Sequence, residues 1–297
     1  MDFIKTRKIF YLLSLILILV SILAMIFWHF RWGIDFKSGT LWEVQLKNNS
    51  DLLKIETILR DNGIVSYLIQ KSNDNIIFLR FNEISEETHQ KLLSLFKEQI
   101  SDIKELSFSS IGPSIGKSLI IKSLWGVGLV LLGILLYLIY AFRQASFSIP
   151  SYKYGILAII ALIHDSIIVT GFLVIMGKLL GWELNSDFLV ALLTILGYSV
   201  HDTIVVYDRI RENLKMNALK NIKLTKEELA KVINLSIKQN FWRALNTSNT
   251  TLIPLIALLI WGPDSIKILT SAMIVGIIIG TYSSICVASA LLYDWFS

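Results

Sequence analysis

Cysteine is almost missing from this chain, because Cys286 is the only one among 297 residues. A single cysteine excludes an internal disulfide. Charged residues are also scarce, at 17%, and they avoid long stretches that are almost wholly apolar. The sequence therefore predicts a membrane protein and not one that works by itself in aqueous solution.

The apolar stretches match the thickness of a bilayer. The hydrocarbon core is about 30 Å thick, so a spanning helix needs roughly 20 apolar residues. The first stretch is too long for a secretory signal and lacks a small-x-small cleavage site, so we expect a retained anchor. We predict a polytopic α-helical membrane protein with six transmembrane helices: Ile9–Phe27, Ser123–Phe142, Gly155–Met176, Phe188–Tyr207, Ala244–Trp261 and Ile268–Leu291.

Basic residues gather in alternate loops. Residues 208–243 hold nine Lys and Arg against four acids, the loop after the second span holds Arg143 and Lys153 without an acid, and the amino terminus holds Lys5 and Arg7. Cytoplasmic loops carry such an excess. We therefore predict that both termini are cytoplasmic, and we attribute the net charge of +5 to topology rather than to a nucleic-acid partner.

A folded α+β domain on the outer, periplasmic side is predicted between the first two spans, at residues 31–117, separating residues 1–30 from the bundle at 118–297. It contains no His/Cys cluster and no phosphate loop, so we expect a binding or lever-arm role rather than catalysis. The order β-α-β-β-α-β is the split ferredoxin-like plan. Its elements are Leu41–Leu46, Asp51–Asn62, Ile64–Gln70, Ile76–Phe81, Glu86–Ile100 and Leu106–Ile111, with a Ser-Asn-Asp-Asn hairpin before the third strand.

The predicted cytoplasmic loop, 208–243, contains a capping box. Thr225 is the expected N-cap and Glu228 reaches back to it. Leu229, Val232 and Ile237 follow as part of an apolar stripe. This pattern predicts a short amphipathic helix along the membrane surface or the bundle, most simply an ordinary connecting helix.

Three ionisable groups fall at membrane depth. Asp165 lies in the middle of the third span beside His164, Asp202 lies in the fourth, and Arg243 opens the fifth. Such groups are rare in membranes, since each costs about 2.5–3.5 kcal/mol even on mild insertion scales. We therefore take Asp202, Arg243 and Asp165 as candidate proton-coupling residues.

Two polar stripes accompany these groups. Side chains four apart on a helix share a face, so Asp202 and Arg243 each belong to a polar stripe. The two stripes begin at matching depths on neighbouring spans. A carboxyl there can alternate between a neutral acid and an anion paired with Arg, which is the chemistry of a proton-driven machine with protons as coupling ion and no cofactor. The supporting polar residues are Tyr198, His201, Thr247 and Thr251.

Other interpretations stay open. Arg243 could snorkel to the headgroups as a topogenic charge, and a buried Asp could be structural, hydrogen-bonded to Ser and Thr. A metal site at His164-Asp165 or His201-Asp202 is disfavoured, because adjacent helical residues point apart and no Cys or Glu completes a set.

The sixth span has a face of small residues. Gly276, Gly280 and Ser284 recur every four positions between Ala272 and Ala288. A small-xxx-small face predicts close helix packing, within the chain or with a partner.

Five segments carry a family resemblance: Gly33–Thr40, Ile111–Gly116, Gly197–Asn213, Arg243–Thr251 and Val275–Ser284. In order and spacing they resemble the SecF branch of the SecD/SecF protein-export family over essentially the whole chain. Two positions depart from that pattern: His201 stands where the family usually has Asn, and Ser38 replaces a customary Gly.

The resemblance implies a six-helix half of the resistance-nodulation-division type, completed by SecD in a bacterial inner membrane. It implies work with SecYEG, SecA and the translocating preprotein, driven by the proton-motive force and without covalent chemistry of its own. It also ties Asp202 and Arg243 to proton passage. The alternatives are half of a lipid or small-molecule exporter of the same architecture, and a structural scaffold of the translocon that uses no energy.

Overall fold

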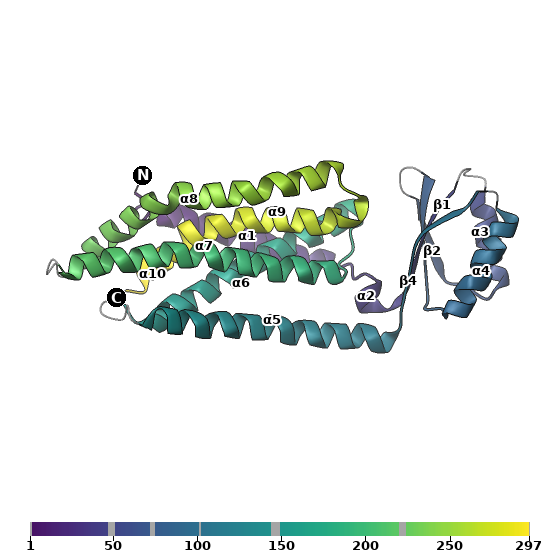
Figure 1. Cartoon of the computed structure of the whole chain (residues 1–297), viewed down its shortest axis with the longest axis horizontal. Helices are drawn as coiled ribbons and strands as arrows, with labels where there is room; N and C mark the ends of the chain where they lie inside the picture. The colour runs from purple at the N-terminus through teal and green to yellow at the C-terminus, as the bar shows by residue number, and fades with distance from the viewer. Residues whose placement is uncertain are drawn as a thin grey trace. The chain divides into compact units, whose positions relative to one another are not determined.

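The computed structural model describes residues 2–46, 51–71, 75–100, 102–143, 149–219 and 224–296. The chain forms two compact units, a helical unit of Met1–Arg31 and Trp125–Ser297 and an α/β unit of Trp32–Leu124. Figure 1 labels their helices and strands.

Six helices are long and apolar enough to cross a membrane, so the predicted number and order of spans are confirmed. The last span changes from α-helix to a π-helical segment, η5, and back, after a short 3₁₀ turn, η4 (Asp264–Ile266). The helices are α1 (Arg7–Trp28), α5 (Pro113–Ala141), α6 (Ser151–Leu180), α7 (Ser186–Leu219), α8 (Lys226–Trp261) and, in the last span, α9 (Lys267–Tyr282), η5 (Ser283–Ala288) and α10 (Ser289–Asp294).

The predicted separate amphipathic helix is wrong, because its residues are the first part of α8. Thr225 does cap this helix, since its hydroxyl accepts a hydrogen bond from the Glu228 amide at 3.3 Å. The helix then continues for 36 residues, which at about 1.5 Å per residue is longer than a bilayer core is thick. The apolar stripe of Leu229, Val232 and Ile237 is buried in the core of the helical unit.

The spans differ in how much of their apolar surface is buried within the chain. Half of the most apolar window is buried in α6 and in α7, and 61% in the last span, against 17% in α1 and none in α5. The centre of the helical unit is therefore built from α6, α7 and the last span.

The small-residue face of the last span lies against α7, as its packing role predicted. A Cβ atom placed on Gly276 would lie 2.4 Å from Ile195, and one on Gly280 would lie 2.9 Å from the Cβ of Ser199. Because ordinary carbon contacts are about 3.5–4.0 Å, only glycine fits at both positions. The partner of this face is thus a helix of the same chain.

The two ends of the chain meet at one end of the helical unit (Figure 1). Arg7 forms an ion pair with Asp294 at 3.1 Å, and the Tyr11 hydroxyl donates to the same carboxylate at 2.9 Å. An even number of spans requires both ends on one side of the membrane, and these contacts further hold them together.

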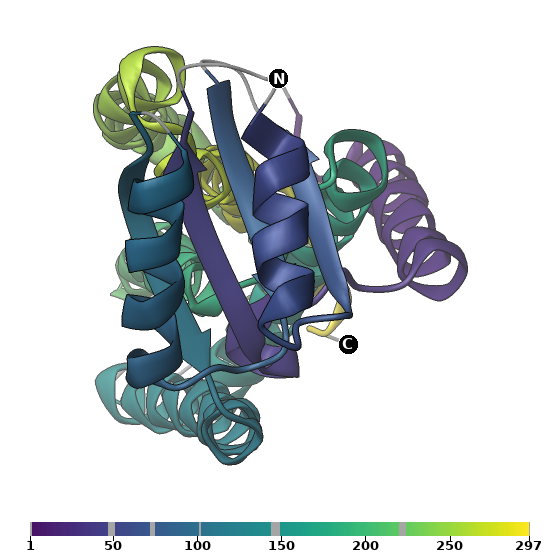
Figure 2. The same cartoon turned by 90° about the vertical axis from the view of Figure 1, so that its right-hand side faces the viewer.

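The α/β unit follows the predicted order of elements. Its four strands form one antiparallel sheet in the order β2-β3-β1-β4, and α3 and α4 cover one face of it (Figure 2). The turn of the predicted hairpin, 72–74, lies outside the described residues. The elements are α2 (Ile34–Lys37), β1 (Gly39–Gln45), α3 (Leu52–Asp61), β2 (Tyr67–Lys71), β3 (Ile76–Phe81), α4 (Glu86–Gln99) and β4 (Lys104–Ile111).

Alternation along the strands explains the layered core. Trp42 and Val44 of β1 point toward the helices and are fully buried with Phe96 of α4, whereas Glu43 between them faces the other side of the sheet. At the entry to β1, Ser38 has a φ of 65°, a conformation that favours glycine. Ser38 therefore holds a backbone conformation that glycine would adopt at lower cost.

Candidate functional site

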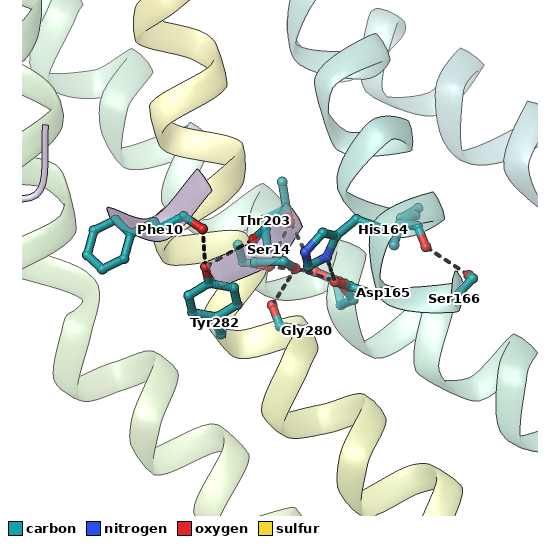
Figure 3. Close-up of polar contacts among 12 residues, drawn as sticks. Phe10, Ser14, His164, Asp165, Ser166, Thr203, Gly280 and Tyr282 are labelled. Carbon is teal, nitrogen blue, oxygen red and sulfur yellow. Dashed lines mark hydrogen bonds and ion pairs between the residues drawn. The ribbon is translucent and has the colours of Figure 1, made fainter. Parts of the chain in front are cut away.

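Asp165 lies in the centre of the helical unit and is completely buried. Its Oδ2 accepts hydrogen bonds from the hydroxyls of Ser199 on α7, at 2.6 Å, and Ser283 on η5, at 2.8 Å. Its Oδ1 lies 2.8 Å from Nδ1 of His164 (Figure 3). One carboxylate on α6 therefore joins three helical segments.

The contact between His164 and Asp165 contradicts the expectation that adjacent helical residues point apart. Both side chains turn into the same interior space, where a hydrogen bond satisfies two polar groups that water does not reach. Within the described ranges, no group of three or more His, Cys, Asp or Glu side chains could hold a metal ion.

Asp202 lies about one helical turn after Ser199 on α7 and is 3% exposed. The Thr281 hydroxyl of α9 lies 3.4 Å from its Oδ2, at the long limit of a hydrogen bond. Thr281 in turn lies 2.5 Å from the hydroxyl of Ser248 on α8. The polar surroundings of Asp202 thus reach α8 through the last span.

Hydroxyl groups of the last span connect the two acids. Ser284 donates to the carbonyl of Ser199 at 3.1 Å and lies 2.8 Å from the hydroxyl of Thr203. Residues 281–284 therefore supply partners to Asp202, through Thr281, and to Asp165, through Ser283. These residues include the start of the π-helical segment, a geometry that is frequent at functional sites.

Arg243 does not meet Asp202. Its side chain is exposed and lines a cavity of about 310 Å³ together with acidic and amide side chains of α7 and α8, among them Asp208, Glu212 and Asn240. In the part of the chain that the structure describes, Arg243 forms no ion pair, so the predicted pairing of carboxylate and guanidinium is not present in this arrangement.

The supporting polar residues lie in different surroundings. Thr247 and Thr251 donate to carbonyls of their own helix, at 2.9 and 3.3 Å, and His201 is exposed. The Tyr198 hydroxyl is buried and, among the described residues, has no hydrogen-bond partner.

Sequence reasoning missed the hydroxyl residues that contact the acids, Ser199, Thr281 and Ser283, and Ser248, which contacts Thr281. The available signal was their chemistry, since small polar residues on otherwise apolar spans commonly form hydrogen bonds between helices. Ser283 lies next to the small-residue face that the sequence did identify.

The sequence of this chain is similar to those of known membrane proteins. Residues 91–297 match the family model of the protein export membrane protein SecD/SecF, C-terminal. The chain is 36% identical to the protein translocase subunit SecF of Thermobaculum terrenum, covering 99% of this chain and 93% of that protein. It is 34% identical to the SecF of Synechocystis, with 99% and 94% covered.

Two solved structures are also similar. SecDF from Thermus thermophilus, described as a translocon-associated membrane protein, superposes with a TM-score of 0.77 at 32% identity. SecDF in its super-membrane-facing form gives 0.63 at 30%. Each comparison covers 99% of this chain and 38% of the SecDF chain, so this chain spans well under half the length of those proteins.

Proposed function

We propose that this chain, which belongs to the SecD/SecF family of protein-export membrane proteins, uses the proton-motive force to promote protein export. The family places it as a multi-pass accessory subunit of Sec translocation. In this proposal it acts with a SecD-type partner beside SecYEG and SecA, in the inner membrane of a bacterium. Both termini are cytoplasmic and the α/β unit lies on the periplasmic side, where it engages the preprotein.

The proposal rests on one observation, the two carboxyl groups buried among hydroxyl groups. Among the described residues, neither Asp165 nor Asp202 has a Lys or Arg within 4 Å, although they are 0% and 3% exposed. A hydroxyl can donate to an anion or accept from a neutral acid. Such surroundings tolerate both protonation states, which a carboxyl group must adopt in turn to carry a proton.

The energy available is sufficient to drive a change of shape. One elementary charge that crosses the membrane releases about 2.3 kcal/mol per 100 mV. A packed bundle has discrete arrangements rather than a continuum, so protonation of Asp202 can favour one arrangement of the last span over another. In this proposal Arg243 acts from its cavity at the α7–α8 surface, and it meets Asp202 only in another step of the cycle.

The proposed partner accounts for the unburied spans. No part of the most apolar window of α5 and only 17% of that of α1 is buried within the chain. The similar SecDF chain is much longer than this one. A SecD-type protein that packs beside the helical unit would complete the assembly, and lipid would cover the remaining surface.

We assign the α/β unit to the ferredoxin-like plan. Its element order is β-α-β-β-α-β, its antiparallel sheet runs β2-β3-β1-β4, and both long helices cover one face. This plan provides a rigid body that α5 can move as the bundle changes shape.

The test is the substitution Asp202→Asn in the chain reconstituted with its SecD partner and the translocon. We expect proton flux and proton-driven stimulation of export to be lost, while membrane insertion and partner binding persist. Asp187→Asn is the matched control, because Asp187 is an exposed acid at the start of the same helix.

Normal flux and export in Asp202→Asn would refute this function. Insensitivity of the subunit's contribution to a protonophore would favour the scaffold alternative instead. Transport of a lipid or small amphiphile by the purified complex without preprotein would favour the exporter.

A further inference from the structure

His164 is a buried imidazole whose two nitrogens have different surroundings. The side chain is 5% exposed, and its Nδ1 lies 2.8 Å from Oδ1 of Asp165. Its Nε2 is buried and has no hydrogen-bond partner among the described residues. The ring lies 6.4 Å from the ring of Tyr282. Such a residue is held by one polar contact, the one with Asp165.

The two carboxylate oxygens of Asp165 have different hydrogen-bond partners. Oδ2 accepts from both Ser199 and Ser283, and in the described structure His164 is the partner of Oδ1. A donor at Oδ1 fixes the plane of the carboxylate, because a carboxylate held at one oxygen only can rotate about its Cβ–Cγ bond. With that plane fixed, Oδ2 points at the two serines.

We propose that His164 is a positioning residue for Asp165. By donating from Nδ1, it orients the carboxylate so that Oδ2 holds α7 and the π-helical segment together through Ser199 and Ser283. This inference rests on the proposed proton coupling. It adds that the coupling depends on a side chain of α6, a helix that carries neither Asp202 nor Arg243.

The consequence extends to Asp202 through the last span. Ser283 lies two residues after Thr281, which is the hydroxyl partner of Asp202. Loss of the correct Asp165 orientation frees Ser283, and the short stretch that contacts both acids loses one of its two anchors. An effect of His164 on proton flux is therefore expected although His164 does not touch Asp202.

The experiment compares three substitutions. The side-chain amide of Asn can donate from nearly the same place as Nδ1, since both nitrogens are bonded to Cγ. The amide of Gln is one carbon further out, and Leu has no donor. We expect His164→Asn to keep export and proton flux within about twofold of the unmodified chain, whereas His164→Gln and His164→Leu fall by roughly tenfold or more, as expected for a lost bond to a charged group.

Ser166→Ala is the matched control on the same helix. Ser166 follows Asp165 directly, but its hydroxyl donates to the carbonyl of Leu162 at 2.8 Å, within its own helix (Figure 3). We expect its removal to leave flux and export unchanged. If His164→Leu does not insert, the comparison of Asn with Gln decides, because both are polar and differ in where the amide lies.

The outcomes separate the two hypotheses. If the unmodified complex shows no proton-driven stimulation, the proposed function fails. If it does, and Asp202→Asn is inactive, but His164→Leu behaves like the unmodified chain, only the inference fails. An inserted His164→Asn variant as impaired as His164→Leu would also overturn it, because the bond to Oδ1 would then not be the property that matters.

Discussion

Replacing Gly276 by alanine tests the packing of α9 on α7 directly. The new Cβ would lie 2.4 Å from both Cδ1 and Cγ1 of Ile195, and 2.8 Å from its Cγ2. These distances are about 1 Å shorter than an ordinary carbon contact. All three atoms belong to one side chain that is 1% exposed, so Ile195 cannot move away without displacing the core around it.

The magnitude follows from two opposing effects. Overpacking costs typically about 1–3 kcal/mol, and alanine returns up to about 1 kcal/mol through its better helix propensity. Because three atoms of Ile195 overlap with the new Cβ, the overpacking cost lies in the upper part of its range, at about 2–3 kcal/mol. Gly276→Ala should therefore destabilise the helical unit by roughly 1–2 kcal/mol. Ile195→Ala alone should cost about 2–5 kcal/mol, because it leaves a cavity.

The double variant makes the prediction specific. With Ile195 shortened to its Cβ, the three overlapping atoms are gone and the new methyl group of residue 276 occupies part of the cavity. We expect the two changes together to cost less than the sum of their separate effects by about 1–3 kcal/mol, as contacting residues in a double-mutant cycle do.

The assay is reversible unfolding of the chain in mixed micelles, with all four members of the cycle measured under one condition. Gly197→Ala is the control, because a Cβ on Gly197 of α7 would meet nothing within 4 Å. It should be neutral or slightly stabilising. A neutral Gly276→Ala, or a cycle that is additive within about 0.5 kcal/mol, would refute the packing argument.

Two further predictions concern the α/β unit and the start of α8. Burial raises the pKa of the Glu43 carboxyl in β1 above its ordinary value, so the native α/β unit loses stability as the pH rises through that folded-state pKa. Glu43→Gln should therefore slow hydrogen exchange of β1 at pH 7 but not at pH 4, and equal exchange rates at pH 7 would contradict this. Thr225→Ala removes the N-cap of α8 and should cost about 1 kcal/mol, seen as faster amide exchange in the first turn of α8; unchanged protection there would show that the cap contributes nothing.

The spans were predictable because their signal is a sum over many residues. A run of about 20 apolar side chains specifies a membrane helix whichever neighbours it has. The end points were less predictable, since polar helical residues carry no such signal. The continuation of α8 through residues 226–243 could have been inferred, because no glycine or proline interrupts it before Pro254.

The acids of the candidate site were also predictable, but their contacts were not. Asp165 and Asp202 stand out because charge is rare on apolar spans. Depth along a helix follows from residue number, whereas the direction in which a side chain points across the bundle depends on how each helix is rotated. This is why Arg243, at a suitable depth, lines an outer cavity while Thr281 reaches Asp202.

The sequence by itself determined the number of spans, the order of elements in the α/β unit, the small-residue face of the last span and the identity of the buried acids. All of these are encoded in local composition and spacing. Only the tertiary structure decided that the small-residue face serves α7, that His164 and Asp165 contact each other, and that hydroxyl groups rather than a guanidinium surround the acids. Those facts depend on the rotation and crossing of helices distant in sequence, which local patterns do not specify.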